Sequence, residues 1–161
     1  MPRILFVCTG NTCRSPMAAA LLKSKHLVGV EVRSAGIFAI NGMDASPYAR
    51  EVIAEEGLDY HHKSKRLEQE DVDWADCILT MSASHQMYIL QNFANAEGKV
   101  FTLKEFACEG NGDVADPFGG SREMYRLTFA ELKRLMEKVV KRIQSRNGSG
   151  GEQWKTGGSI G

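Results

Sequence analysis

Residues 7–16 read Val-Cys-Thr-Gly-Asn-Thr-Cys-Arg-Ser-Pro, and this stretch organises the rest of the chain. Residues 4–7, an apolar run of strand formers, lead into it, and Ser15-Pro16 is a pair suited to open a helix. Cys8 therefore lies where a strand turns into a helix. If the turn closes as a cradle, its backbone N–H groups and the positive end of the helix converge beside the sulfur. Such a point binds an oxyanion, most naturally phosphate.

Each residue type in this loop has a chemical reason to be there. A cysteine is an effective nucleophile only as a thiolate, which helix N-termini and nearby cations favour. Arg14 is that cation, and its planar fork can bind two phosphoryl oxygens at once. Gly10 and Asn11 are residue types that accept positive φ angles, so the backbone amides can turn inward. Ser15 can both cap the helix and donate a hydrogen bond to the Cys8 thiolate.

The alternative for this stretch is an ordinary strand-to-helix connection with a buried thiol. The arginine, serine and proline in register with the cysteine argue against that interpretation. The Gly-x4-Gly-Lys-Ser/Thr loop of nucleotide-binding proteins is absent from the sequence, and so is a redox Cys-x-x-Cys pair.

Composition limits the classes of protein to consider. A chain of 161 residues is long enough for one domain with a full core. Its 20 Lys and Arg residues balance its 20 Asp and Glu residues, which favours neither a nucleic-acid partner nor a membrane partner. The N-terminus has no signal-peptide pattern, and no apolar run is long enough to span a bilayer. We expect a cytoplasmic protein.

Four cysteines could form disulfides, hold a metal ion or remain free thiols. Disulfide frameworks belong to small secreted chains, and zinc sites need paired ligands at characteristic spacings. Cys77 and Cys108 have no second cysteine at a metal-binding spacing in the sequence. Cys77 is expected in the core, and Cys108 has no assigned role. No metal and no other cofactor is expected, because Arg14 and a helix N-terminus supply positive charge.

Strand and helix patterns alternate along the chain and predict an α/β fold. We expect an open four-stranded parallel sheet flanked by helices, with the phosphate-binding loop after the first strand. The expected strands are residues 4–7, 30–34, 76–81 and 100–103. The expected helices are residues 17–25, 48–56, 68–72, 82–93 and 122–145. The apolar stripe of the 82–93 helix is assigned to Met87, Ile89, Leu90 and Phe93.

Residues 110–120 form the second informative stretch, a glycine-rich loop that contains Asp116-Pro117-Phe118. Asp116 is the candidate general acid, because it precedes a proline and an aromatic residue that could flank a substrate; Asp113 is its rival. Residues 1–146 are expected to form the domain. Residues 147–161 are expected to be a flexible glycine-rich tail, which has too few apolar groups to order itself.

Cys8, five intervening residues, Arg14 and Ser15 reproduce the Cys-x5-Arg-Ser signature of cysteine-dependent phosphatases. Its position near the N-terminus, a second cysteine at Cys13 and the Asp-Pro-Phe sequence at 116–118 resemble the low-molecular-weight protein tyrosine phosphatase family. This resemblance covers roughly residues 3 to 145. Within the family, Thr12 and the stretch 116–120 are most similar to the bacterial protein-arginine phosphatases.

The resemblance implies a reaction and a set of site residues. Proteins phosphorylated on arginine are the expected substrates, hydrolysed through a phosphocysteine intermediate. The implied catalytic residues are Cys8, Arg14 and Asp116, and the implied substrate-binding residues are Thr9, Gly10, Asn11, Thr12, Cys13, Ser15 and Phe118. The resemblance also implies a reversible disulfide between Cys8 and Cys13, which would protect the nucleophile from irreversible oxidation.

Two further residues near the loop have competing interpretations. By resemblance Ser34 hydrogen-bonds Asn11 or Ser15, and the alternative is a plain strand end. His62 lies in a basic segment, residues 61–66, which is expected to be a solvated loop; the resemblance would instead place His62 against the phosphate-binding loop.

The sequence is also compatible with other functions. A tyrosine phosphatase of the same fold is the first alternative. Arsenate reduction uses a similar loop but needs additional shuttling cysteines, which Cys77 and Cys108 do not convincingly provide. A non-catalytic phosphoprotein-binding or redox-sensing module is the alternative from another class. Oligomeric state is not predicted.

Overall fold

The computed structural model describes residues 2–58, 61–110 and 112–148. Its sheet consists of four parallel strands: β1 (Arg3–Cys8), β2 (Glu31–Gly36), β3 (Cys77–Thr80) and β4 (Val100–Thr102). They stand in the order β2-β1-β3-β4, which confirms the predicted open α/β sheet. The strand order reverses at β1, and ligands bind beyond the carboxyl ends of the strands at such a switch point. The loop after Cys8 begins there.

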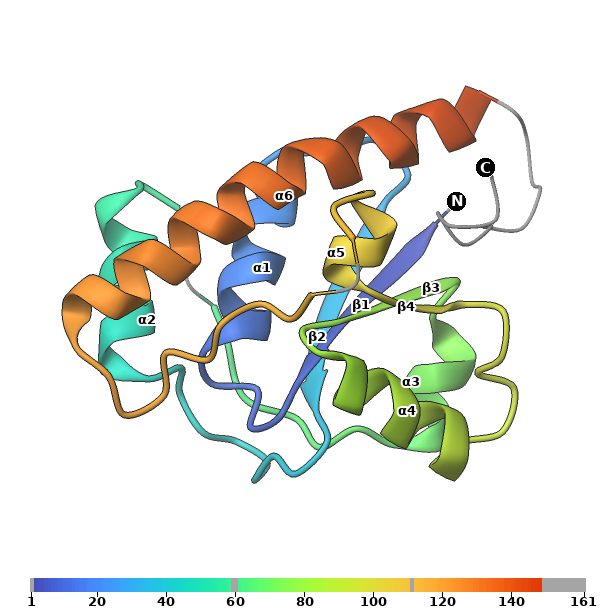
Figure 1. The fold of residues 1–161 in the computed structure, drawn as a ribbon, viewed down its shortest axis with the longest axis horizontal. Helices are drawn as coiled ribbons and strands as arrows, with labels where there is room; N and C mark the ends of the chain where they lie inside the picture. The colour runs from blue at the N-terminus through green and yellow to red at the C-terminus, as the bar shows by residue number, and fades with distance from the viewer. Residues whose placement is uncertain (1, 59–60, 111, 149–161) are drawn as a thin grey trace.

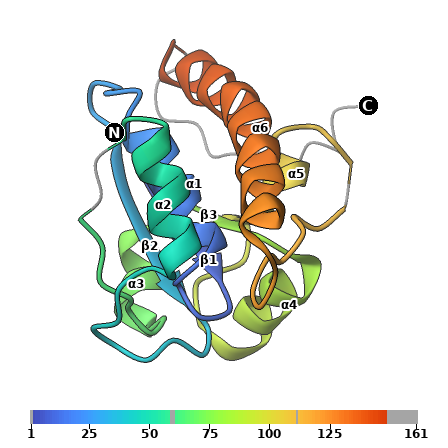
Figure 2. The same cartoon turned by 90° about the vertical axis from the view of Figure 1, so that its left-hand side faces the viewer.

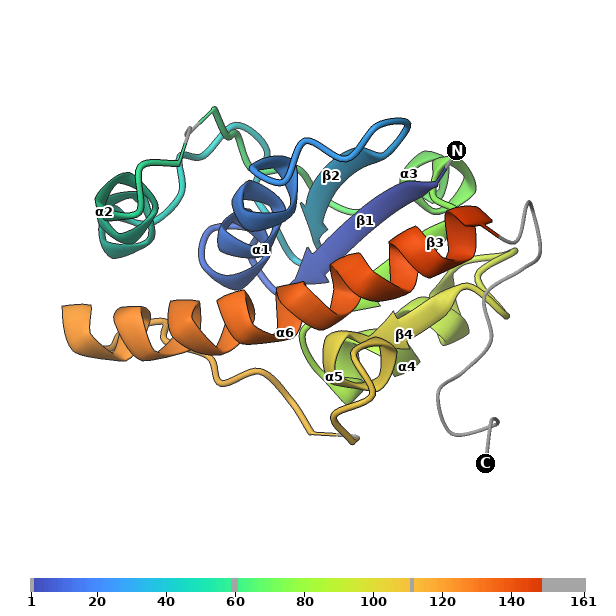
Figure 3. The ribbon, with the colours of Figure 1, turned by 90° about the horizontal axis from the view of Figure 1, so that it is seen from above.

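The helices form one layer on each side of the sheet (Figure 1). They are α1 (Arg14–Lys23), α2 (Pro47–Glu55), α3 (Gln69–Trp74), α4 (Ala83–Asn92), α5 (Leu103–Phe106) and α6 (Arg122–Gly148). Figure 2 and Figure 3 show α6 and α1 over one face, with α2 beside them, and α3 and α4 on the other face. Two apolar clusters fill the spaces between the sheet and these layers.

The pleat of β1 decides which layer each of its side chains meets. Ile4, Phe6 and Cys8 belong to the cluster shared with α1 and α6, whereas Leu5 and Val7 belong to the cluster shared with α3 and α4. Cys8 thus ends the strand with its side chain buried on the α1 side, and 2% of the residue is exposed.

The start of the first helix and the presence of α5 differ from the sequence expectation. α1 begins at Arg14, with Cys13 as its N-cap residue, so Ser15 lies inside the first turn and is not the cap. The Ser15 hydroxyl is instead hydrogen-bonded within the loop. The four-residue helix α5 was not predicted; a capping box between Thr102 and Glu105 opens it directly after β4.

The predicted apolar stripe of α4 is wrong at Met87 and Leu90, which are 60% and 45% exposed. Ile89 is fully buried, and His85 lies one turn before it on the same inward face. The helix therefore packs on the sheet through His85 and Ile89, because residues four apart share a face. Phe93, at the C-cap, is half-buried.

α6 continues to Gly148 and so includes the first two residues of the predicted tail. The rest of that tail, residues 149–161, lies outside the described residues. Among the helices of the described ranges, none is both long enough and apolar enough to cross a membrane.

Candidate active site

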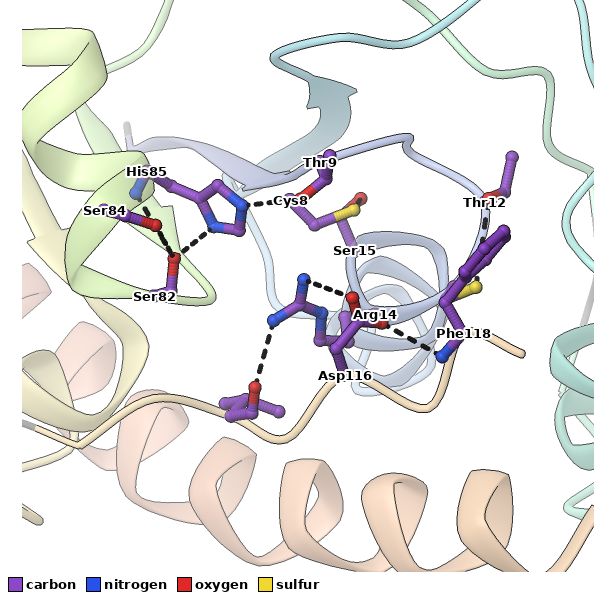
Figure 4. Close-up of polar contacts among 12 residues, drawn as sticks. Cys8, Thr9, Thr12, Arg14, Ser15, Ser82, Ser84, His85, Asp116 and Phe118 are labelled. Atoms are coloured by element: carbon purple, nitrogen blue, oxygen red, sulfur yellow. Dashed lines mark hydrogen bonds and ion pairs between the residues drawn. The ribbon is translucent and has the colours of Figure 1, made fainter. Parts of the chain in front are cut away.

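The loop between β1 and α1 folds back on its own cysteine. The backbone N–H of Asn11 points to Cys8 Sγ at 3.3 Å. The Ser15 hydroxyl lies 2.8 Å from the same sulfur (Figure 4). Both groups can donate to a sulfur anion, and the N-terminus of α1 adds about half a positive charge nearby. Of the two loop residues expected to take a positive φ, only Asn11 does, with φ 56°.

The Asn11 side chain is fully buried and holds the loop in this shape. Its Nδ2 donates to Ser15 Oγ at 2.8 Å and to Ser34 Oγ at 2.9 Å, which confirms the expected Ser34 contact. Its Oδ1 accepts from the backbone N–H of Lys65 at 2.9 Å. Every polar group of the amide thus has a partner, so the left-handed turn at Asn11 is held from three segments of the chain.

His62 lies against the loop, so the expected solvated position is wrong and the family resemblance is right. Its Nε2 is 2.7 Å from the backbone carbonyl oxygen of Asn11. Because a carbonyl oxygen only accepts, Nε2 must carry a hydrogen. Burial lowers the pKa of His62 below its usual value, which favours the neutral ring.

Gly36, the last residue of β2, lets the neighbouring strand approach the loop. A Cβ atom at this position would lie 2.7 Å from the Thr9 carbonyl oxygen and 2.8 Å from the Asn11 backbone nitrogen. Both contacts are shorter than side chains tolerate and both are with backbone. Gly36 is therefore required for the close approach and not for an unusual backbone angle.

Arg14 connects the loop to a segment about a hundred residues further along the chain. Its side chain is 7% exposed. Nη1 donates to the Val114 carbonyl oxygen at 3.0 Å, and Nη2 lies 3.4 Å from Asp116 Oδ2. The Asp116 side chain is half exposed, and its Oδ1 accepts from the Phe118 backbone N–H at 3.0 Å. The structure thus brings Arg14 and Asp116 together beside Cys8 (Figure 4).

Asp113, the rival candidate for the acid, has a different contact. Its Oδ1 accepts from the backbone N–H of Ala83, in the first turn of α4, at 2.9 Å. Asp113 thus contacts a helix terminus, whereas Asp116 contacts Arg14 at the end of the loop. This geometry favours Asp116 over Asp113 as the acid.

Thr12 and Phe118 lie on the rim. Thr12 is half-buried, with its hydroxyl 3.8 Å from Cys13 Sγ, and Phe118 is 75% exposed. In Figure 4 both are drawn on the opposite side of Arg14 from His85. Thr9 is exposed, and Gly10 is half-buried. All the sequence-predicted site residues therefore belong to the loop or to the segment that contacts it.

Cys13 is buried, and its sulfur lies 3.3 Å from the Tyr125 hydroxyl and 3.6 Å from Ser46 Oγ. Burial, together with the hydrogen bond to Cys13, raises the pKa of Tyr125 to about 12. Tyr125 therefore remains a neutral phenol at neutral pH and can donate to the sulfur. All four cysteines are free thiols in this structure.

Sequence reasoning missed His85, which contacts the loop from α4. Its Nε2 lies 2.9 Å from the Thr9 hydroxyl, and its Nδ1 lies 2.8 Å from Ser82 Oγ. No local pattern marks this histidine, because its partner Thr9 is 76 positions away. Within the described ranges, no group of three or more His, Cys, Asp and Glu residues is arranged to hold a metal ion.

Comparison with known proteins gives one consistent match. Residues 3–148 match the family model described as low molecular weight phosphotyrosine protein phosphatase. A protein-arginine-phosphatase from Geobacillus stearothermophilus is 50% identical over 143 residues, which cover 89% of this chain and 97% of that protein.

Solved structures agree with this match. The YwlE arginine phosphatase from Geobacillus stearothermophilus superposes with a TM-score of 0.91 at 47% identity, covering 96% of this chain and 100% of that chain. A mutant of the YwlE arginine phosphatase with a phosphorylated active-site serine gives a TM-score of 0.85 at 43% identity. The match covers 88% of this chain and 95% of that chain.

Proposed function

Because the chain belongs to the low-molecular-weight phosphotyrosine protein phosphatase family, we propose that it is a protein-arginine phosphatase, which hydrolyses phosphoarginine on proteins. The observation that carries the chemistry is the placement of Arg14 and Asp116 beside the hydrogen-bonded sulfur of Cys8. The choice of phosphoarginine is supported by the named relatives and by Thr12 on the rim. Its partners are then phosphorylated proteins.

The proposed reaction has two steps. The Cys8 thiolate attacks phosphorus, the P–N bond breaks, and Asp116 gives its proton to the departing guanidine nitrogen. Asp116, now a carboxylate, then takes a proton from a water molecule that attacks the phosphocysteine. The S–P bond breaks, inorganic phosphate leaves and the thiolate is restored. Metal ions have no step in this scheme.

Charge stabilisation falls to Arg14 and the loop. The loop backbone from Thr9 to Cys13, with the start of α1, would hold the phosphoryl oxygens through N–H groups, and Ser15 would donate to the departing sulfur in the second step. Arg14 would bind two phosphoryl oxygens with its fork. Phe118 would flank the phosphoguanidinium group.

Substrate choice gives the most direct test. Wild-type protein should release phosphate faster from a phosphoarginine peptide than from the matching phosphotyrosine peptide. Thr12→Ile should lower this preference by roughly 10–100-fold, because a larger apolar wall suits a phenol ring better than a guanidinium group. Thr12→Val is the matched control, since it removes the hydroxyl without adding length. Equal or better turnover of phosphotyrosine by the wild type would contradict the arginine assignment and leave a tyrosine phosphatase.

We also propose that Cys13 is the redox partner of Cys8. Peroxide would convert the Cys8 thiol to a sulfenic acid, and the Cys13 thiol would then displace water to form the disulfide. A reducing thiol would restore both cysteines. Cys13 lies five positions after Cys8 as the N-cap residue of α1, and its sulfur contacts the Tyr125 and Ser46 hydroxyls in the reduced protein.

Peroxide treatment should therefore inactivate the wild type reversibly, with loss of the mass of two hydrogen atoms and full recovery in dithiothreitol. Cys13→Ala should be inactivated irreversibly, with a mass gain from sulfinic or sulfonic acid at Cys8. Cys108→Ser, a substitution of an exposed cysteine, should behave as the wild type. Full recovery of Cys13→Ala would refute the pairing. A nucleophile that must stay reduced also fits the cytoplasm, which we infer as the location.

A further inference from the structure

The first turn of α4 contacts both loops of the active site. On one side, His85 Nε2 lies 2.9 Å from the hydroxyl of Thr9, the residue that follows Cys8. On the other side, the Ala83 backbone N–H donates to Asp113 Oδ1 at 2.9 Å. Asp113 lies three residues before Asp116, so this turn joins the loop that contains the nucleophile to the segment that contains the acid.

His85 is built into this turn and cannot rotate freely. It is 8% exposed, its Nδ1 lies 2.8 Å from Ser82 Oγ, and its backbone N–H donates to the same oxygen at 3.3 Å. Ser82 is the N-cap residue of α4 and also lies 2.9 Å from the Ser84 hydroxyl. Both ring nitrogens of His85 therefore have oxygen partners whose positions the helix start defines.

The surroundings of His85 favour a neutral ring. Burial and the nearby positive charge of Arg14 lower the pKa of His85 to about 4, against the opposing effect of the Asp113 and Asp116 carboxylates. At neutral pH the ring thus has one donor and one acceptor. It can bridge the Thr9 and Ser82 hydroxyls in either tautomer without adding positive charge beside Arg14.

The contacts close a ring around the site. Val114 N–H donates to the Met81 carbonyl oxygen at 2.9 Å, and the Val114 carbonyl oxygen accepts from Arg14 Nη1 at 3.0 Å. The path runs from Thr9 through His85 and the start of α4 to Val114, and returns through Arg14 to the loop. Breaking it at the contact between Thr9 and His85 removes the side-chain hydrogen bond of the residue next to the nucleophile, whose carbonyl oxygen still accepts from the Phe38 backbone N–H.

We propose that His85 is a positioning residue, whose hydrogen bond to Thr9 holds the Cys8 loop in register with the Asp116 segment. This rests on the proposed phosphatase function but on neither choice of substrate. The loop amides must match the phosphoryl oxygens most closely in the transition state, so loss of the contact should lower kcat more than it changes KM.

Two substitutions at His85 separate its two contacts. A glutamine amide reaches about as far as Nε2 and can still meet Thr9, whereas an asparagine amide reaches only about as far as Nδ1 and can meet Ser82. We expect His85→Asn to lower kcat about tenfold with KM within about threefold, and His85→Gln to keep kcat within about threefold of the wild type. Thr9→Val, which removes only the hydroxyl, should also lower kcat about tenfold.

The decisive measurement is the double variant Thr9→Val with His85→Asn, assayed on an aryl phosphate that either kind of family member can hydrolyse. Loss of one shared contact predicts a total decrease of about tenfold, and independent roles predict about a hundredfold. The shape of the kcat/KM profile between pH 5.5 and 8 should be unchanged in His85→Asn, because a neutral positioning ring does not titrate there.

Three outcomes would each overturn the proposal. They are a roughly hundredfold loss of kcat in the double variant, an unchanged kcat in Thr9→Val, and the loss of one limb of the pH profile in His85→Asn. Thermal unfolding of every variant identifies a loss of kcat that comes from misfolding. If His85→Asn unfolds, the kcat values of His85→Gln and Thr9→Val still test the proposal. A wild type that hydrolyses the aryl phosphate but not phosphoarginine would refute only the substrate assignment. A wild type that hydrolyses neither would refute the proposed function itself.

Discussion

Cys8→Ser is expected to lower kcat on a phosphoarginine peptide by ~10⁴-fold or more, because it removes the attacking group of the first step. A serine hydroxyl is a far weaker acid than a thiol, so the neighbouring groups that can stabilise a thiolate do not produce an alkoxide. The substitution replaces one atom, and the donors from Asn11 and Ser15 remain in place. Phosphate binding should therefore survive, and KM or the inhibition constant of phosphate should change by less than about threefold.

Cys108→Ser is the matched control, since it makes the same chemical change at an exposed cysteine and should leave kcat unaltered. Mass spectrometry supplies a second readout: any slow turnover by Cys8→Ser should leave a phosphoryl group on the introduced serine. Retention of more than about a hundredth of the wild-type kcat would exclude Cys8 as the nucleophile.

Asp116→Asn is expected to lower kcat on phosphoarginine by roughly 10³-fold. The asparagine oxygen can still accept from the Phe118 backbone N–H, so the turn of the segment is preserved while the proton donor is lost. The decrease should be smaller when the leaving group is a nitrophenolate, because that group departs without help in the first step. With such a substrate a burst of nitrophenolate should precede slow turnover, since the second step lacks its base.

Asp113→Asn is the matched control for the acid. Its amide oxygen can still accept from Ala83, so the contact with α4 persists and kcat should stay within about threefold of the wild type. A larger loss in Asp113→Asn than in Asp116→Asn would exchange the roles of the two aspartates. Equal losses on phosphoarginine and nitrophenyl phosphate, with no burst, would exclude Asp116 as the proton donor.

Prediction from the sequence succeeded where the contacts are local. The loop is closed by hydrogen bonds between residues three to seven positions apart, from Asn11 and Ser15 to Cys8 and from Asn11 to Ser15. Residue types and spacing therefore indicate both its shape and its anion chemistry. The alternation of strand and helix patterns likewise predicted the parallel sheet, because every strand is followed by a helix.

Prediction failed where a side chain's environment comes from another element. His62 looked like part of a solvated basic segment, but the fold places it against the Asn11 carbonyl. Met87 and Leu90 looked like core residues, yet α4 turns a different face to the sheet. In each case hydropathy reports the preference of a residue for burial and not the direction in which its element packs.

The residues proposed for the chemistry could be found in the sequence: a cysteine, an arginine and a serine in one short loop, and an aspartate in a glycine-rich segment. The distant groups that meet that loop follow from the fold. Val114 and Asp116 reach Arg14, and His85 reaches Thr9, because the order β2-β1-β3-β4 places β3 and the start of α4 next to β1. Local hydrogen bonds can be predicted from residue spacing, whereas contacts across 76 to 102 positions depend on how strands pair and helices pack.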